Sequence, residues 1–139
     1  MKKSFLNGNS PFITEMIQVK TAKLAEYKIR NAIADGATAI GLQLAGLERE
    51  AITEEKLSAI FACAENKPIY LTNYRGALNA GKTDDELMDG LLFGLKCGAT
   101  LIDVMGDTYS PAPEELTTDK QAIKKQMELV EELHGKGAE

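Results

Sequence analysis

Four times along the chain, a short run of β-branched, aliphatic and aromatic residues is followed by a stretch in which apolar residues recur with helical spacing. The short runs predict strands at about 12–19, 39–44, 68–74 and 100–105. The periodic stretches predict helices at about 21–35, 53–64, 83–97 and 118–134. Strands that alternate with helices at this spacing are typical of parallel βαβ units. The sequence therefore predicts an α/β fold with four consecutive parallel β/α units.

Three of the predicted helices show a clear apolar stripe that we expect to face the sheet. The stripe residues are Ala25, Ile29, Ala32 and Ile33 in the first helix, Leu87, Leu91 and Leu95 in the third, and Ile123, Met127, Val130 and Leu133 in the last. Thr83 and Glu86 have the spacing of a capping box, which predicts that the third helix begins there.

The joints between helices and strands repeat the same residues. Gly36–Ile40 and Gly98–Ile102 both read Gly-Ala-Thr-x-Ile, and Gly137–Glu139 begins a third copy. In each joint we expect the glycine to end a helix and a strand to follow at once. A barrel of this type contains eight strands in about 250 residues. The four units predict about half of a TIM (β/α)8 barrel, so that residues 1–139 form a single incomplete domain, a fragment of the full barrel.

Polar residues are predicted near the C-terminal ends of the strands, where barrels and open α/β sheets place their sites. One face of each strand meets the helices and the other fills the barrel interior. In the second strand, apolar Ile40 and Leu42 are assigned to the helices. In the third strand, the inward set is Ile69, Leu71, Asn73 and Arg75, because the run becomes polar only towards its end. The predicted inward polar residues are Gln43, Asn73, Arg75 and Asp103, with Asp107 just after the fourth strand.

Structural roles are open alternatives for these side chains. Asp103 could be a buried hydrogen-bonding residue of the barrel interior, and Arg75 could simply pair with Asp103 or Asp107. Glu15 is either an inward-facing acid or a sign that the sheet is open at that edge.

The segment Gly76–Thr83 fits the phosphate-loop pattern G-x-x-x-x-G-K-[ST] and lies between a predicted strand and a predicted helix. Two features argue against a nucleotide site. Asp84, Asp85 and Glu86 follow at once, and their carboxylates would repel a triphosphate. As an N-cap, the Thr83 hydroxyl is committed to a backbone amide and is not free for magnesium. Nucleotide binding therefore remains the less favoured alternative to a glycine-rich loop.

Composition excludes several classes of function. The chain has 139 residues and a net charge of −5, and its Lys and Arg residues are scattered, so we expect no nucleic-acid partner. No apolar run approaches the roughly 20 residues that cross a bilayer, so we expect no membrane segment. Cys63 and Cys97 match no metal-ligand spacing and predict two reduced thiols in a cytoplasmic protein.

The order of these segments resembles that of type I 3-dehydroquinate dehydratases. The resemblance runs from Phe12 to Glu139 and is carried mainly by Lys67–Arg75 (KPIYLTNYR) and Gly98–Val104 (GATLIDV). It implies a TIM barrel that dehydrates 3-dehydroquinate to 3-dehydroshikimate in the shikimate pathway of aromatic amino acid biosynthesis. It also implies a lysine Schiff base with a histidine as general acid and base, and neither a metal nor an organic cofactor.

Under this resemblance, Arg75 matches the family's arginine of the substrate pocket and Asp103 the aspartate of strand four. The chain departs from the family where Gly41-Leu42-Gln43 replaces Glu-x-Arg, where Asn79 replaces an acid, and where Met105 replaces a glutamate. The departures suggest another hydroxylated cyclic carboxylic acid as substrate. The predicted substrate-binding residues are Arg75, Asp103, Gln43, Asn73 and Asn79.

The family's lysine and histidine lie on strands beyond the fourth, so we expect no catalytic residue in this chain and no activity from the chain alone. Its single histidine, His134, is interpreted as a cation at a helix C-terminus. Half a barrel exposes two sheet edges, which predicts self-association, with a homodimer as the expected form. A non-catalytic, self-assembling half-barrel is the alternative function.

Overall fold

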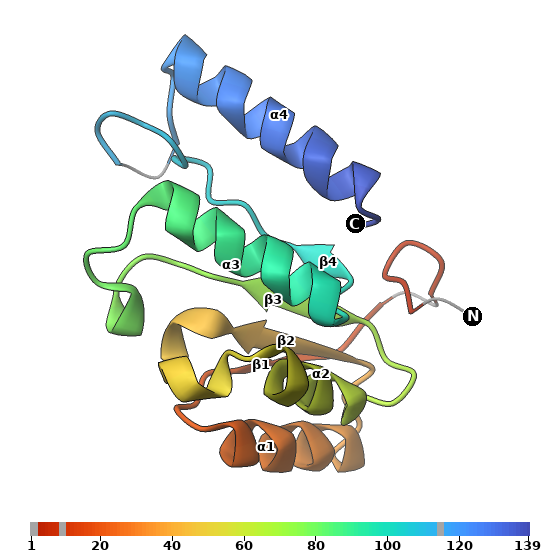
Figure 1. The fold of residues 1–139 in the computed structure, drawn as a ribbon. Helices are drawn as coiled ribbons and strands as arrows, with labels where there is room; N and C mark the ends of the chain where they lie inside the picture. Colours follow the sequence, from red (N-terminus) through yellow and green to blue (C-terminus); the bar gives the residue numbers. More distant parts are fainter. Residues whose placement is uncertain (1–2, 9–10, 114–115) are drawn as a thin grey trace.

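The computed structural model describes residues 3–8, 11–113 and 116–139, and it contains one parallel four-stranded sheet in the order β1-β2-β3-β4 (Figure 1). The strands are β1 (Thr14–Ile17), β2 (Ala39–Gln43), β3 (Ile69–Thr72) and β4 (Leu101–Ile102). The helices are α1 (Ala22–Ala34), α2 (Glu54–Ala62), α3 (Asp84–Cys97) and α4 (Lys120–Gly135). Short 3-10 helices follow the second and third strands, namely η1 (Leu44–Gly46), η2 (Arg49–Ala51) and η3 (Ala77–Asn79). The predicted α/β fold of four parallel β/α units is confirmed.

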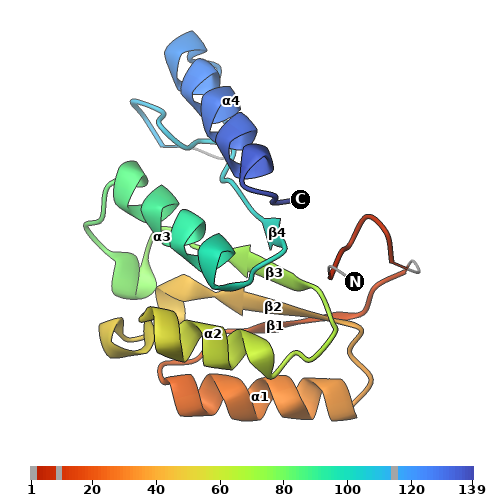
Figure 2. The same cartoon turned by 45° about the vertical axis from the view of Figure 1, so that its right-hand side comes forward.

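Helices α1, α2 and α3 cover one face of the sheet, and α4 lies beside α3 and β4 (Figures 1 and 2). The core fills the space between these helices and the strands, with Ile29, Ile40, Leu57 and Leu91 among its fully buried members. No helix of the described residues covers the opposite face of the sheet, which we call the inner face.

Each of the four helices begins where a short polar side chain accepts a hydrogen bond from the first turn. Thr21, Thr53 and Asp119 accept from the backbone N–H three residues later, at 3.3, 3.3 and 2.8 Å. Thr83 forms the predicted capping box, because its Oγ1 accepts from Glu86 N and the Glu86 carboxylate accepts from Thr83 N at 2.7 Å. The predicted start of the third helix is confirmed.

The three Gly-Ala joints share one backbone geometry. Gly36, Gly98 and Gly137 have φ values of 102°, 122° and 91°, in the left-handed region that favours glycine. In each joint the N–H of the following alanine donates to the carbonyl five residues earlier, for example Ala99 N to Gly94 O at 3.1 Å. This bond turns the chain back towards the sheet, so that a strand begins at once.

The third joint places Glu139 in parallel pairing with β4. Glu139 N donates to Thr100 O at 2.9 Å, and Ile102 N donates to Glu139 O at 3.2 Å. The Glu139 carboxylate also accepts from Ser4 Oγ and from Phe5 N, which ties the N-terminal segment to the same end of the sheet. Glu139 therefore lies where a fifth parallel strand would begin.

The predicted orientation of the third strand is wrong. Ile69 and Leu71 pair in register with Ile40 and Leu42, and all four side chains lie in the helix-side core. A Cβ at Gly94 would meet Leu71 Cδ2 at 2.1 Å, which shows how closely α3 packs on this side chain. Ile69, Leu71 and Asn73 therefore face the helices, while Tyr70 and Thr72 lie on the inner face.

The predicted orientation of the last helix is also wrong in part. Its buried residues are Ala122, Leu129 and Leu133, whereas Ile123, Met127 and Val130 are 37%, 60% and 37% exposed. The helix carries two apolar stripes, and the one that packs against α3 and β4 is not the one predicted from the spacing of apolar residues. The stripes predicted for the first and third helices are confirmed, with Leu95 and Ile33 at their half-buried rims.

Candidate functional site

Two tyrosines and an aspartate form a hydrogen-bonded cluster on the inner face, near the C-terminal ends of β3 and β4. Tyr70 Oη donates to Asp103 Oδ2 at 2.8 Å, and Tyr74 Oη donates to the same oxygen. Among the described residues, no group donates a hydrogen bond to the other oxygen of Asp103. The cluster presents a carboxylate oxygen and two aromatic rings at the end of a parallel sheet where α/β proteins bind ligands.

Both tyrosines of the cluster are held in the protonated form. Burial and the hydrogen bond to Asp103 raise the pKa of Tyr70 far above its ordinary value. The hydrogen bond to Asp103, together with burial, raises the pKa of Tyr74. The two phenols therefore remain donors at neutral pH, and they fix the orientation of the Asp103 carboxylate.

Thr72 and Gln43 are paired at the ends of β3 and β2, next to the cluster. Thr72 is 1% exposed, and its Oγ1 has no hydrogen-bond partner among the described residues. Gln43, its neighbour in β2, accepts from Ala45 N at 3.0 Å and from Tyr74 N at 3.2 Å. Gln43 lies at the C-terminal end of its strand, as predicted, where it holds the backbone of Tyr74 in place.

Arg75 bridges two carboxylates beside this cluster. Its guanidinium donates to both oxygens of Asp107, at 2.7 and 2.8 Å, and to both oxygens of Asp84, at 2.7 and 2.9 Å. Asp84 also accepts from Tyr109 N at 2.6 Å. The pairing with Asp107 that the sequence left open is therefore formed, and it ties the loop after β3 to α3 and to the loop after β4. That Arg75 binds substrate stays a prediction.

Asn73 and Asn79 lie away from the inner face and support the loop after β3. Asn73 Nδ2 donates to Leu87 O in α3 at 2.8 Å, and Asn79 Nδ2 donates to Asn73 Oδ1 at 2.7 Å. Lys82 Nζ donates to Asn79 Oδ1 at 2.7 Å. The inward position predicted for Asn73 is wrong, because its amide is satisfied between the sheet and α3. Substrate binding by these two amides is not tested by the structure, and their near-complete burial favours a structural role.

The loop Gly76–Thr83 shows the contacts expected of a glycine-rich connection rather than of a nucleotide site. The Thr83 hydroxyl and backbone amide both contact Glu86. Lys82 is bound to Asn79, and Asp84 is bound to Arg75. The side chains of Lys82 and Thr83, which a phosphate loop would use, are therefore engaged within the protein.

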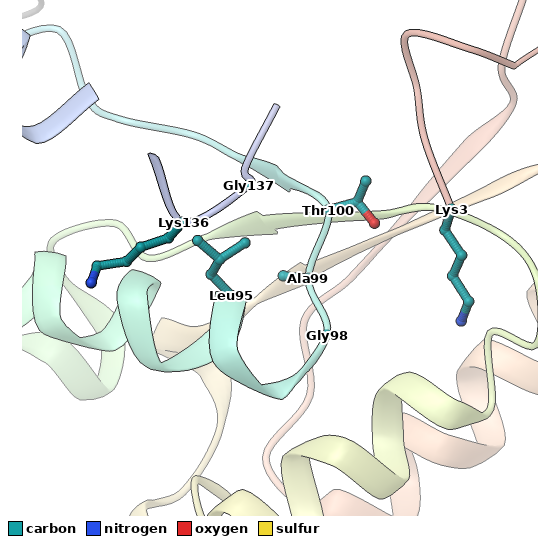
Figure 3. Close-up of a pocket in the computed structure, with 7 residues that line it drawn as sticks. All are labelled: Lys3, Leu95, Gly98, Ala99, Thr100, Lys136 and Gly137. Carbon is teal, nitrogen blue, oxygen red and sulfur yellow. The ribbon is translucent and has the colours of Figure 1, made fainter. Parts of the chain in front are cut away.

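A cavity of about 370 Å³ lies at the opposite end of the sheet, beside the joints that follow α3 and α4 (Figure 3). Its lining residues are Lys3, Leu95, Gly98, Ala99, Thr100, Lys136 and Gly137. Burial lowers the pKa of Lys3, but Lys3 and Lys136 point away from each other in Figure 3 and do not converge on a common point. This end of a barrel usually serves stability, and we assign no site to it.

The tyrosines of the cluster were not predicted from the sequence. Asp103 was placed on the inner face, and the contact with Tyr70 confirms that position. Tyr70 and Tyr74 were missed because the third strand was assigned the opposite orientation. The alternation of Tyr70, Thr72 and Tyr74 shows that they share one face of the strand, but it does not show which face meets the helices.

Within the described residues, no group of three or more His, Cys, Asp or Glu side chains is arranged to hold a metal ion. None of the helices in this part of the chain combines the length and apolarity needed to cross a membrane.

Comparison with known proteins does not identify a family for this chain. Neither protein-family models nor curated proteins match the chain. Among solved structures, it is similar to the crystal structure of a putative mandelate racemase/muconate lactonizing enzyme from Sorangium cellulosum, with a TM-score of 0.47 and 24% sequence identity. The match covers 68% of this chain and spans 25% of that chain.

Proposed function

We propose that this chain forms the substrate-binding part of a (β/α)-barrel lyase related to type I 3-dehydroquinate dehydratase. The observation that carries the proposal is the Asp103 carboxylate, held by Tyr70 and Tyr74 on an uncovered inner face. The ligand is a hydroxylated cyclic carboxylic acid. The resemblance of Lys67–Arg75 and Gly98–Val104 to that family supports this substrate class.

The residues of the cluster bind and orient the ligand. The free oxygen of Asp103 accepts a hydrogen bond from a ring hydroxyl of the ligand. The tyrosine rings pack against the carbocycle. Because both phenols stay protonated, each can accept a hydrogen bond from the ligand while it donates to Asp103.

Dehydration needs groups that the described residues do not place on the inner face. In the family, a Schiff-base lysine acidifies the adjacent C–H bond, and a histidine removes that proton and assists the loss of water. Both belong to strands that follow the fourth, so further (β/α) units would have to supply them. The chain alone then binds the acid without converting it, and the full activity would belong to the shikimate pathway of aromatic amino acid biosynthesis.

A cytoplasmic location is part of the same proposal. Cys63 and Cys97 are both free thiols, as expected for a protein in a reducing compartment.

The proposal is tested by titrating 15N-labelled protein with 3-dehydroquinate and with quinate while backbone amide shifts are recorded. Binding should shift the amides of Thr72, Tyr74 and Asp103 in a saturable way. Tyr70→Phe removes one hydroxyl from the cluster and should weaken binding about three- to tenfold, the effect of one hydrogen bond. Tyr27→Phe removes an exposed hydroxyl from α1 and is the matched control, which should bind like wild type.

Two results would contradict the proposal. The first is an inner face that shows no shift at millimolar concentrations of either acid. The second is a set of shifts centred on Gly81–Asp85 with magnesium ATP, which would favour the nucleotide-binding alternative.

A further inference from the structure

Arg75 is engaged by carboxylates of the protein itself. All three nitrogens of its guanidinium donate to Asp84 or Asp107, so that one cation faces two anions. Asp103 adds a third carboxylate at the same end of the sheet, and it would repel the carboxylate of an acid bound beside it. A ligand that places a ring hydroxyl on Asp103 therefore needs another cation for its own carboxylate.

Lys20 offers such a cation at the C-terminal ends of the strands. It is exposed and lies in the loop between β1 and α1. Its backbone is held in place, because its carbonyl accepts from Glu48 N at 2.8 Å and the neighbouring Thr21 caps α1. Among the described residues, no carboxylate lies within ion-pair distance of its ammonium group. Its side chain is therefore open to an anionic ligand.

A cavity of about 460 Å³ lies beside Lys20, between the loops that follow β1, β2 and β3. A Cβ at Gly46 would meet Gln18 Cγ at 2.9 Å, which shows how closely the loops after β1 and β2 approach each other. The lining residues besides Lys20 are Gln18, Val19, Gly46, Ala77 and Leu78. Lysine is thus the one cationic side chain of a cavity whose other walls are small, apolar or neutral.

This cavity is next to the inner-face cluster, because two of its walls are tied to Tyr74. Gln43, which caps η1, accepts from Tyr74 N at 3.2 Å, and Asn79 of η3 donates to Tyr74 O at 2.9 Å. The phenol of the same tyrosine binds Asp103. The ends of β1 and β4 are three strand spacings apart, about 14 Å along the sheet. An extended lysine side chain, a six-membered ring and a hydrogen bond on each side of the ring together span that distance.

We infer that Lys20 binds the carboxylate of the ligand while Asp103 accepts a hydrogen bond from a hydroxyl on the opposite side of the ring. The inference rests on the proposed function and assigns the part of the site that recognises the acid group. It also sets one orientation of the ligand, because the reversed ring would place two carboxylates against each other at Asp103. The ligand class is thereby narrowed to cyclic acids that carry the carboxylate and a hydroxyl on opposite sides of the ring.

Titrations of 15N-labelled protein with quinate and with methyl quinate test the inference. The ester keeps the ring hydroxyls and removes the negative charge. The wild-type protein should bind quinate about three- to tenfold more tightly than the ester, the effect of one charge-assisted contact. Lys20→Met should weaken the binding of quinate to that of the ester and leave the ester unaffected. Lys28→Met removes the same charge from an exposed position on α1 outside the cavity, and this matched control should keep the preference for quinate.

The position of the shifted amides gives a second readout. Quinate should shift the amides of Gly46 and Leu78 in the wild-type protein, and Lys20→Met should reduce these shifts. A Lys20→Met variant that still prefers quinate would overturn the inference. An equal loss of preference in Lys28→Met would overturn it as well, because that result indicates long-range attraction by the charge of the whole protein.

Failure of this subsite can be told apart from failure of the proposed function. If quinate and its ester bind equally well and both shift the amides of Thr72, Tyr74 and Asp103, only the role of Lys20 is wrong. If neither ligand shifts these inner-face amides, the proposed function is contradicted, and the assignment of Lys20 falls with it.

Discussion

Replacing Arg75 with methionine tests whether the paired carboxylates beside the site hold the two loops together. The substitution keeps most of the aliphatic stem and removes the guanidinium, which donates to Asp84 and Asp107. The side chains of Arg75, Asp84 and Asp107 are 30%, 18% and 8% exposed, so the carboxylate of Asp107 in particular would be left buried without a cation.

The expected cost follows from this partial burial. Removing one partner of a fully buried ion pair costs about 3–5 kcal/mol, whereas exposed pairs contribute little. With Arg75 partly exposed, and Asp84 still bonded to Tyr109 N, we expect a loss of about 2–3 kcal/mol in the free energy of unfolding. At a urea m-value of about 1–3 kcal/mol/M, the midpoint should fall by roughly 0.7–3 M.

Urea denaturation followed by far-UV circular dichroism measures this change. The matched control is Lys96→Met, because Lys96 and Glu54 also pair at 2.7 Å but have side chains that are 63% and 62% exposed. This control should leave the midpoint nearly unchanged. If Arg75→Met lowers the midpoint no more than Lys96→Met does, burial of the carboxylates does not stabilise the loops and the reasoning fails.

Two further predictions concern pH and the helix-to-strand joints. Because the pKa values of Tyr70 and Tyr74 are raised, the folded protein holds these protons more tightly than the unfolded chain; their contribution to stability is complete below pH 10 and is lost as the pH rises above it. Urea midpoints between pH 8 and 11 should therefore fall with pH, and Tyr70→Phe should make this fall less steep. An equally steep fall in the variant would contradict the assigned hydrogen bonds. Gly98→Ala forces a φ of 122° on a residue with a side chain and should lower the free energy of unfolding by about 1–2 kcal/mol. The control Gly135→Ala, at a helical position where an added Cβ meets nothing within 4 Å, should be neutral or stabilising. Equal urea midpoints for the two variants would argue against the left-handed joint.

The fold could be predicted from the sequence because its signals are local. Strand and helix runs, the capping box of Thr83 and Glu86, and the repeated Gly-Ala joints are each determined by neighbouring residues, and each is found in the structure. The observed strands are shorter than the predicted runs. β4 keeps only Leu101 and Ile102, which pair with Tyr70 and Leu71, and Asp103 N still donates to Leu71 O beyond its end.

The orientation of β3 could not be read from its own residues. Ile69, Tyr70, Leu71 and Thr72 are all compatible with burial, so alternation does not show which face meets the helices. Only the pairing with β2, and the close approach of α3 at Gly94, decides it. Because β3 was assigned the opposite orientation, Tyr70 and Tyr74 were not predicted as residues of the site.

The orientation of α4 depends on a different kind of information. Ala122, Leu129 and Leu133 form one stripe, and Ile123, Met127 and Val130 form another at similar spacing. A helix with two apolar stripes is oriented by the elements that it packs against. Among the described residues, α3 and β4 contact α4 on one side only. Such ambiguity is itself informative, because the stripe left exposed marks a surface that a partner can cover.

A crystal structure of the chain with quinate bound would test the assignment of the inner face as a ligand-binding surface most directly. We expect the ring to lie over Tyr70 and Tyr74 with a hydroxyl within hydrogen-bond distance of Asp103. A ligand bound instead in the cavity beside Lys3, or over the loop Gly76–Thr83, with the inner face empty, would contradict that assignment and the function proposed from it.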